Sequence, residues 1–451
     1  MPPTQATRKQ RGAWYTPADL VELVVEFLLD DLVGWEAGRS IRILDPACGD
    51  GRFLDELRVR LHLAGYTVHS TGCDIDADAL AQISYANMRR VHADALHHDW
   101  GGETFDMVVG NPPYLSQMAI STTRGGASRH GGGPYADTAA EFLALAVRLA
   151  DPGHGRVGLV LPQSILASRD AHPVREQVAR EADLAWSWWR AEQRHFDASI
   201  NVCALGFRRP SSGRTTQLDW TRVVTDQLGV PHLDPADLAV DGTVGDRSDL
   251  NANFRDEYYA LVPAVGDDVD GPPLVTSGLI DPGVCHWGVR PVKFAKRNFD
   301  HPRVDLSRLT GRFPAWAERK LVPKVLVANQ TRIVEAVADD AGAWIPGVPV
   351  TTVVPHDPAS VWAVTAVLTS PIASALCWHY GGGTGLSTRS VRVGPAVLSA
   401  IPWPSGDLTE AVTALRDADP AACGRAVMHA FGREPSSADP LVAWWSGQLP
   451  V

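Results

Sequence analysis

The sequence lacks paired cysteines, long apolar runs and an apolar leader, and each absence excludes a class of protein. Six cysteines are scattered singly along 451 residues without a C-x-x-C pair, so we expect neither a zinc knuckle nor a disulfide framework. No apolar run approaches the roughly 18 residues of a transmembrane helix, so no membrane contact is expected. Residues 1–11 are polar and basic. Together with the unpaired cysteines, they indicate a cytoplasmic protein.

Positive charge is scarce overall but concentrated in one stretch. The net charge of −11 argues against a general nucleic-acid binder. Residues 286–332, here called the basic island, nevertheless hold eleven lysines and arginines against three acids, so this stretch carries +8 and the remainder −19. Such an island in an acidic chain is typical of a surface that contacts phosphates. The alternative is a solvated face that compensates acids elsewhere.

The turn after the first expected strand has neither the G-x-G-x-x-G of a dinucleotide site nor the lysine of a P-loop. A short apolar strand, 41–44, leads into Asp45-Pro46-Ala47-Cys48-Gly49-Asp50-Gly51, and a helix is expected from residue 52 to about 64. Gly49 and Gly51 allow a ligand to approach the backbone. Asp45 suits a cationic or amine ligand rather than a pyrophosphate. Strand, glycine-bearing turn and helix are the first unit of a doubly wound sheet.

Two further strands are expected to end at acidic residues on the same edge of this sheet. The strand over 67–73 leads to Asp74, which lies 23 residues beyond Gly51, where an acid reaches ribose hydroxyls in such folds. Asp76 is expected to cap a helix over about 77–88. Asp94 follows the next strand and can accept a hydrogen bond from an adenine amino group. Each acid alone is also compatible with a cap or a turn.

The turn after the fourth expected strand reads Asn111-Pro112-Pro113-Tyr114. Proline locks φ and lacks an N–H, so the pair fixes the backbone after Asn111. The Asn111 side-chain oxygen and the Pro112 carbonyl can then accept both hydrogens of an amino group, and Tyr114 offers a ring for stacking. An ordinary Asn-Pro turn is the alternative. Four polar strand ends on one edge favour a site.

The rest of the first half completes the sheet. Thr16 and Pro17 are expected as N-cap and first residue of a helix that ends near 32. Residues 116–134, rich in Gly, Ser and Thr, are either a loop that closes over a substrate or a disordered insertion. Further elements are expected at 137–150, 155–161, 173–181 and 202–207, which gives about seven strands ending near 209.

The second half shows fewer patterns. Residues 210–285 are rich in Asp, Pro and Gly, and we expect them to begin a second domain with long loops. Glycines, hydroxyls and arginines between 381 and 392 suit phosphate or base-edge contacts. A plain β-turn is the alternative there. Two helices, about 408–416 and 420–431, are expected in a C-terminal tail.

With these residues in view, the chain resembles the gamma-type N6-adenine DNA methyltransferases, the TaqI-like and Eco57I-like enzymes. The match covers residues 11–209 and is limited to 389–404 beyond them. The resemblance implies an α/β fold, with a class I Rossmann-like methyltransferase sheet of about seven mostly parallel strands and a C-terminal mixed α+β target recognition domain. It implies a catalytic domain over 1–209, the target recognition domain over 210–405 and a helical tail over 406–451.

The resemblance implies S-adenosylmethionine as the cofactor. The Asp45–Gly51 loop is similar to the family's methionine-binding loop, Asp74 to its ribose-binding acid and Asp94 to the acid that reads the cofactor adenine. An Asp rather than a Glu at 74 shortens the reach to the ribose, and Ala95 stands where relatives often place an aromatic. The implied cofactor-binding residues are Tyr15, Thr16, Asp45, Pro46, Ala47, Cys48, Gly49, Gly51, Asp74, Ile75, Asp94, Ala95, Asn111 and Pro113.

The resemblance also implies the reaction, methylation of adenine N6 in double-stranded DNA. It predicts a monomer in a restriction-modification or phage-defence system, with companion restriction or defence subunits possible and no metal required. Phe196 is similar to an aromatic that packs on the extruded base. The implied catalytic residues are Asn111, Pro112, Pro113, Tyr114 and Phe196. The DNA-binding residues expected from the island and the glycine-rich stretch are Arg290, Lys293, Lys296, Arg297 and Arg389.

The motif does not by itself define the substrate. Asn-Pro-Pro-Tyr also serves enzymes that methylate a glutamine amide in release factors, and some RNA adenine methylases. The roughly 240 residues after the catalytic domain favour DNA. A DNA-binding modification subunit that is active only with partners is the alternative from a different class.

Overall fold

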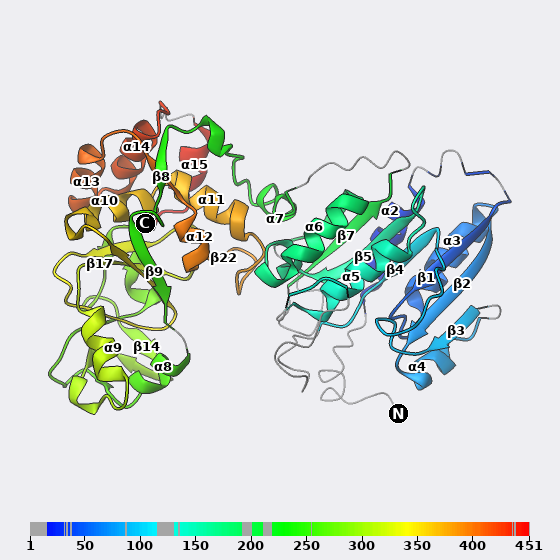
Figure 1. The fold of residues 1–451 in the computed structure, drawn as a ribbon, viewed down its shortest axis with the longest axis horizontal. Coiled ribbons are helices and arrows are strands. Elements are labelled where there is room, and N and C mark those ends of the chain that lie inside the picture. Colours follow the sequence, from blue (N-terminus) through cyan, green and yellow to red (C-terminus); the bar gives the residue numbers. More distant parts are fainter. Residues whose placement is uncertain are drawn as a thin grey trace. The chain divides into compact units, whose positions relative to one another are not determined.

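The structure is a computed structural model of the 451-residue chain. It describes residues 16–450 except 31, 33–34, 37, 86–87, 115–129, 134–135, 192–200, 211–218, 254, 435 and 437–438. The chain divides into two compact units, Met1–Val223 and Val224–Val451, whose ribbons are drawn in Figure 1.

A seven-stranded sheet forms the centre of the first unit, in the order β3-β2-β1-β4-β5-β7-β6 (Figure 1). β1 to β5 run parallel, and β7 runs antiparallel to both of its neighbours. This arrangement confirms the predicted mostly parallel, Rossmann-like sheet. The strands are β1 (Ser40–Asp45), β2 (Thr67–Asp74), β3 (Met88–His92), β4 (Met107–Gly110), β5 (Arg156–Pro162), β6 (Asp183–Trp188) and β7 (Val202–Arg208).

Helices pack against this sheet at close range. α2 (Ala18–Leu29) lies against β5 and β7, where two glycines leave room for it. A Cβ at Gly206 would lie 2.4 Å from the Phe27 ring, and one at Gly158 would lie 2.8 Å from Val24. The other helices of this unit are α3 (Arg52–Leu63), α4 (Ala77–Gln82), α5 (Thr138–Leu149) and α6 (His172–Glu181), and α7 (Arg222–Thr225) spans the division between the units.

The helix expected over 77–88 is shorter than predicted. α4 ends at Gln82, and Met88 is already the first residue of β3, where it pairs with Ser70 of β2. The prediction was wrong because parallel pairing with β2 outweighs local helix preference at this edge. The cap was predicted correctly, since the Asp76 side chain accepts hydrogen bonds from the backbone N–H groups of Asp78 and Ala79.

The second unit is built from antiparallel strands and short helices. Its largest sheet has the order β19-β17-β21-β9, with β9 (Ser248–Ala252), β17 (Lys324–Ala328), β19 (Ala336–Asp339) and β21 (Val350–Pro355). The mixed α+β character was predicted. The described residues of this unit also form six two-stranded ladders, namely β8 (Val240–Thr243) with β23 (Pro402–Pro404), β10 (Val265–Gly266) with β16 (Arg303–Val304), β11 (Leu274–Val275) with β20 (Ile345–Pro346), β12 (Ile280–Asp281) with β13 (Val284–Cys285), β14 (Val292–Phe294) with β15 (Arg297–Phe299) and β18 (Gln330–Thr331) with β22 (Val391–Arg392).

A helix of the second unit, α11 (Pro371–Gly381), extends to the first residue of the glycine-rich stretch that was expected between 381 and 392. Trp378 and its neighbours lie in α11, and the buried Trp378 donates from Nε1 to the Arg332 carbonyl at 2.7 Å. Burial of this ring explains why helix continues to Gly381. The helices are α8 (Arg255–Leu261), α9 (Phe313–Lys320), α10 (Val361–Leu368), α11 (Pro371–Gly381), α12 (Pro395–Ser399), α13 (Thr409–Arg416), α14 (Pro420–Ala430) and α15 (Pro440–Ser446).

The last helices belong to the second unit. α13 and α14 confirm the two helices expected in the tail, and both pack against α10. α15 was not anticipated. In the part of the chain that the structure describes, no single helix has the length and apolarity to cross a membrane, although the segments 358–368 and 371–381, bent by 70°, meet those criteria as a pair.

Candidate active site

The carboxyl end of β1 carries a buried acid. Asp45 is 1% exposed, and its Oδ1 accepts a hydrogen bond from the Ala47 backbone N–H at 2.9 Å. Burial raises the pKa of the Asp45 carboxyl well above its usual range, and the nearby carboxylates of Asp74 and Asp50 add to this effect. A cation placed beside Asp45 would offset that penalty, because an opposite charge favours the ionised form.

The loop that follows Asp45 is held against the end of β2. Asp74 accepts the Gly49 backbone N–H on Oδ2 at 2.8 Å and the Asp76 N–H on Oδ1 at 2.9 Å. The Cys48 N–H donates to the Cys73 carbonyl at 2.9 Å. Asp74 therefore braces the loop, and its remaining lone pairs can still accept hydrogen bonds from a ligand.

The third acid lies in a turn after β3. Asp94 accepts the Leu96 N–H at 3.0 Å on Oδ1, and its Oδ2 lies 2.7 Å from Nδ1 of His97. The Asp94 side chain is exposed, whereas Ala95 is 3% exposed. Ile75, at the end of β2, is 61% exposed, which is unusual for an isoleucine and leaves an apolar surface beside Asp74.

The Asn-Pro-Pro-Tyr turn begins directly after β4, and both ends of the Asn111 amide have partners. Asn111 Nδ2 donates to Thr16 Oγ1 at 3.0 Å, and Tyr114 donates its hydroxyl to Asn111 Oδ1. Tyr114 is 8% exposed, and burial raises the pKa of its hydroxyl well above the usual range. The amide is therefore fixed in one orientation by two side chains.

Thr16 does not cap the first helix, so that prediction was wrong. The N-cap of α2 is Pro17 and no side chain caps it. Thr16 is 3% exposed, its hydroxyl accepts from Asn111, and its carbonyl accepts from Nη1 of Arg52 at 2.8 Å. It thus joins the turn after β4 to the start of α3. A hydrogen bond between two residues 95 positions apart cannot be predicted from a local capping pattern.

Gly110 is a site residue that sequence reasoning missed. A Cβ at Gly110 would lie 2.5 Å from Oδ1 of Asp45, so the backbone of β4 passes directly against the buried carboxyl. Any larger residue would displace Asp45 or the strand. The available signal was the glycine itself, since glycine inside a strand often marks a close approach.

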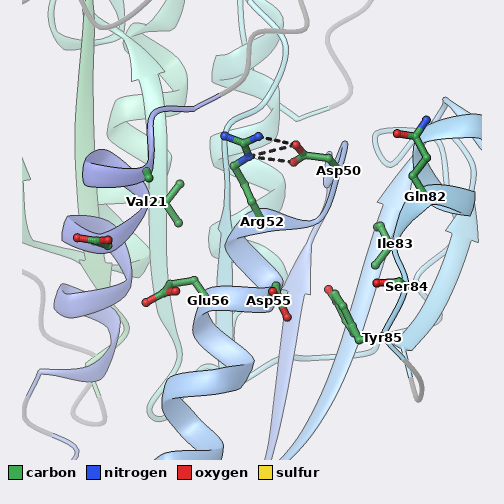
Figure 2. Close-up of a pocket in the computed structure, with 11 residues that line it drawn as sticks. Val21, Asp50, Arg52, Asp55, Glu56, Gln82, Ile83, Ser84 and Tyr85 are labelled. Atoms are coloured by element: carbon green, nitrogen blue, oxygen red, sulfur yellow. Dashed lines mark hydrogen bonds and ion pairs between the residues drawn. The ribbon is translucent and has the colours of Figure 1, made fainter. Parts of the chain in front are cut away.

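A surface cavity of about 410 Å³ includes Asp50, from the loop that follows Asp45, in its lining (Figure 2). Figure 2 shows Arg52 bonded to Asp50 at one end of it and Tyr85 facing it from beyond the end of α4. None of the predicted cofactor residues that the structure describes lines this cavity. Its lining is Ala18, Val21, Glu22, Asp50, Arg52, Asp55, Glu56, Gln82, Ile83, Ser84 and Tyr85.

The basic island is less uniform in the structure than in the sequence. Lys320 and Lys324 are buried, and Lys324 pairs with Asp339. Arg290, predicted to contact DNA, pairs with Asp281 at 2.7 Å. Two further island arginines, Arg308 and Arg312, pair with Asp305 and Asp256 at 2.9 Å each.

Three other predicted DNA contacts, Lys293, Lys296 and Arg297, share one hairpin. β14 and β15 bury Val292, Phe294 and Phe299 and leave the three cations exposed. Ala295 and Lys296 form the two-residue connection with φ of +49° and +65°, as a hairpin turn requires. Arg389 is exposed in the loop before β22.

Some predictions fall outside the described residues. Tyr15 and Phe196 are among them, as is most of the 116–134 stretch, of which 130–133 are described. Within the described residues, no group of three or more His, Cys, Asp or Glu is arranged to hold a metal ion.

Comparison with known proteins matches the first unit to one family. Residues 3–216 match the family model "N-6 DNA Methylase". The type II methyltransferase M.TthHB8I of Thermus thermophilus is 32% identical over 200 residues, which are 40% of this chain and 41% of that protein. A release factor glutamine methyltransferase of Bordetella pertussis is 29% identical over 161 residues, 33% of this chain and 57% of that protein. The chain spans about half the length of these curated relatives.

One solved structure resembles the fold of the whole chain. The type IIL restriction-modification enzyme MmeI, solved in complex with DNA, matches with a TM-score of 0.58 at 14% identity, over 99% of this chain and 80% of that chain. At this identity the likeness concerns the fold alone.

The sheet order and the glycine-bearing loop after β1 are those of a class I, Rossmann-like methyltransferase fold, and the family match supports S-adenosylmethionine as its cofactor. Within that class, residues 3–216 match the N-6 DNA methylase family model. The side chains fit the cofactor, because a buried carboxyl and two further acids suit its ammonium, hydroxyl and amino groups.

Proposed function

We propose that this protein methylates the N6 amino group of adenine in double-stranded DNA, within a restriction-modification or phage-defence system. The observation that carries the proposal is the Asn111 amide, held by Thr16 and Tyr114 next to the glycine that abuts Asp45. A rigid acceptor beside a buried carboxyl suits an amine substrate next to a cationic cofactor. In this proposal residues 1–209 catalyse, 210–405 recognise the DNA and 406–451 form the tail.

Asn111 supplies the acceptor that the reaction needs. The amino nitrogen of adenine is a poor nucleophile because its lone pair is delocalised into the ring. Asn111 Oδ1 and the Pro112 carbonyl accept its two hydrogens, which favours a tetrahedral nitrogen and stabilises the charge that develops on attack. An amide oxygen has two lone pairs, so Oδ1 can accept from Tyr114 and from the substrate together.

Asp45, Asp74 and Asp94 orient the cofactor. When bound, S-adenosylmethionine supplies an electrophilic methyl group on a sulfonium. Asp45 would hold the ammonium of its methionine part, and burial of Asp45 would make this pairing more favourable than it is in water. Asp74 accepts from the ribose and Asp94 from the adenine amino group. Positioning of the two reactants supplies much of the acceleration in a displacement of this kind.

The target base must leave the duplex before it reaches Asn111. In the proposal, Tyr114 and Phe196 pack on its two faces and offset part of the unstacking cost.

The hairpin formed by β14 and β15 is the best candidate for phosphate contacts. Lys293, Lys296 and Arg297 project from it and take part in no ion pair with another described residue. Arg290 is held by Asp281, so it contributes less net positive charge to a partner. Exposed cations without internal partners are the ones that can neutralise phosphates.

The test uses the purified full chain with methyl-labelled S-adenosylmethionine and three substrates, namely duplex DNA of mixed sequence, structured RNA and a release factor. We expect label in DNA, recovered as N6-methyladenine after digestion. Label in RNA, or in a glutamine of the release factor, would mean that this molecule and not DNA is the substrate. The release factor is included because the chain matches a release factor glutamine methyltransferase. DNA binding without transfer to any substrate would favour a modification subunit that needs partners.

A further inference from the structure

A buried carboxylate and a histidine connect α5 to the turn that carries Asp94. Glu141 lies in α5, among residues that are otherwise small or apolar on its buried face, and it is 6% exposed. Its Oε2 accepts the His130 N–H and its Oε1 accepts the Gly132 N–H, both at 2.7 Å. A buried carboxylate is costly unless hydrogen-bonded, so these two donors account for its presence.

Gly132 approaches Glu141 closely enough to exclude a side chain. A Cβ at Gly132 would lie 2.4 Å from Oε1 of Glu141. The carboxylate and the glycine therefore form a matched pair, and they fix the backbone that carries His130.

The His130 ring reaches from this anchor to the neighbouring turn. Its Nε2 lies 3.1 Å from the Leu96 carbonyl, and its Nδ1 contacts Nη2 of Arg148. Arg148 can only donate, so Nδ1 accepts and the proton sits on Nε2, which donates to Leu96. Burial lowers the pKa of His130, and the charge of Arg148 acts in the same direction, so the neutral ring is favoured.

Leu96 is hydrogen-bonded to both His130 and Asp94. The Leu96 N–H donates to Asp94 Oδ1 at 3.0 Å while its carbonyl is held by His130. The same turn is fixed from the other side, because Trp100 donates from Nε1 to the Ala95 carbonyl at 3.1 Å. Release of the Leu96 carbonyl would therefore loosen the turn on which the Asp94 carboxylate sits.

We infer that His130 and Glu141 are positioning residues, which hold Asp94 where it accepts the 6-amino group of the cofactor adenine. The inference rests on the proposed function, because the role of Asp94 is part of that proposal. It predicts that loss of the His130 contact weakens recognition of the amino group specifically, rather than the whole site.

The test compares two amide variants of one histidine. The amide nitrogen of Gln lies near the position of a histidine Nε2, whereas that of Asn lies near Nδ1. His130→Gln therefore keeps the donor to Leu96, and His130→Asn loses it. His172→Asn serves as the control, because His172 is an exposed histidine of α6 whose partner is Glu176.

The readout is calorimetric affinity for S-adenosylhomocysteine and for its analogue with hydrogen in place of the 6-amino group. We expect H130N to weaken S-adenosylhomocysteine binding about tenfold, the factor that corresponds to about 1.4 kcal/mol. H130Q and H172N should stay within about twofold of wild type, and the analogue should bind all proteins alike. E141Q, which replaces one acceptor of the anchor by a donor, should follow H130N.

Two results would overturn the inference. One is equal weakening of both ligands by H130N at an unchanged melting temperature, which would mean a general effect on the site. The other is wild-type affinity in H130N. These measurements need no nucleic acid. If the protein binds the cofactor but methylates no DNA, the proposed substrate is wrong, and the role of His130 can still be tested.

Discussion

The parallel sheet of the first unit and the antiparallel ladders of the second bring polar groups together in different ways. In the first unit, Asp45 and Asp74 are the last residues of β1 and β2, and Asn111 directly follows β4. These three strands are parallel neighbours, so the sheet places the three residues at one edge. In the second unit, many strands are only two or three residues long. Successive side chains of a strand point to opposite faces, so each short ladder exposes a different set of residues, as Lys293 shows between the buried Val292 and Phe294.

This difference decides what a sequence pattern can reveal. In a parallel sheet, the polar residues of a site lie in short motifs at the ends of the strands, and such motifs can be recognised in the amino-acid sequence. In the ladders the relevant property is whether a cation has an internal partner, and that depends on contacts such as Arg312 with Asp256, 56 residues apart. The count of charged residues therefore located the basic island, but it could not show which of its lysines and arginines form ion pairs with acidic residues.

The largest effect is expected at the strand edge of the first unit. Asn111→Ala removes the acceptor that stabilises the developing charge, so kcat should fall on the order of 10²- to 10³-fold. Affinity for S-adenosylhomocysteine should fall much less than kcat, because the Asn111 amide is held by Thr16 and Tyr114 and its proposed role is to accept from the substrate amine. Single-turnover methyl transfer and calorimetry measure the two quantities. An active variant would remove Asn111 from the mechanism.

Gly110→Ala tests whether β4 and Asp45 act as one site. The added Cβ would lie 2.5 Å from Oδ1 of Asp45, so we expect cofactor affinity to fall at least about tenfold. Overpacking of this kind also lowers the free energy of unfolding, by about 1–3 kcal/mol.

Gly153→Ala is the control for adding a methyl group at an uncrowded glycine, because the nearest heavy atom to its Cβ, Oδ1 of Asp151, lies at 3.5 Å. Both variants are compared by cofactor titration and denaturant unfolding. If the two variants have the same cofactor affinity and the same free energy of unfolding, the close approach of Gly110 to Asp45 affects neither cofactor binding nor stability.

The second unit is tested by two double variants that remove the same charge. K293Q/K296N removes two exposed hairpin lysines, and Asn suits the positive φ at 296. We expect DNA affinity to fall about tenfold at moderate salt, and the slope of log K against log salt to become shallower by about 1–2, since each phosphate contact contributes about 0.9.

R308Q/R312Q is the control, because both arginines are paired with acids. Its DNA affinity and salt slope should remain closer to wild type. If both double variants shift the slope equally, net charge alone governs binding and the distinction between paired and free cations fails.

The smallest effect is expected at Thr16. Thr16→Val removes the acceptor for Asn111 Nδ2 while keeping the shape of the side chain, so kcat should fall about 5- to 10-fold, the cost of one hydrogen bond. Thr16→Ser keeps the hydroxyl and should retain most of the activity. If both variants have the same kcat, Thr16 does not orient the amide.

Most of the first unit could be predicted from the sequence because its elements carry local signals. The strand before Asp45, the glycine turn and the cap at Asp76 follow from composition and spacing within a few residues. The helix limits near 82–88 and the partner of Thr16 could not be predicted, because strand pairing with β2 and a bond to Asn111 outweigh local preferences there.

The sequence by itself determined the order of strands and turns, since hydrophobic spacing, glycine and proline act over a few neighbouring residues. Only the tertiary structure decided which polar groups meet. Gly110 abuts Asp45, Glu141 anchors the backbone of His130, and Arg290 pairs with Asp281. The physical reason is that burial and hydrogen bonding depend on distance in space, and the folded sheet and ladders set that distance.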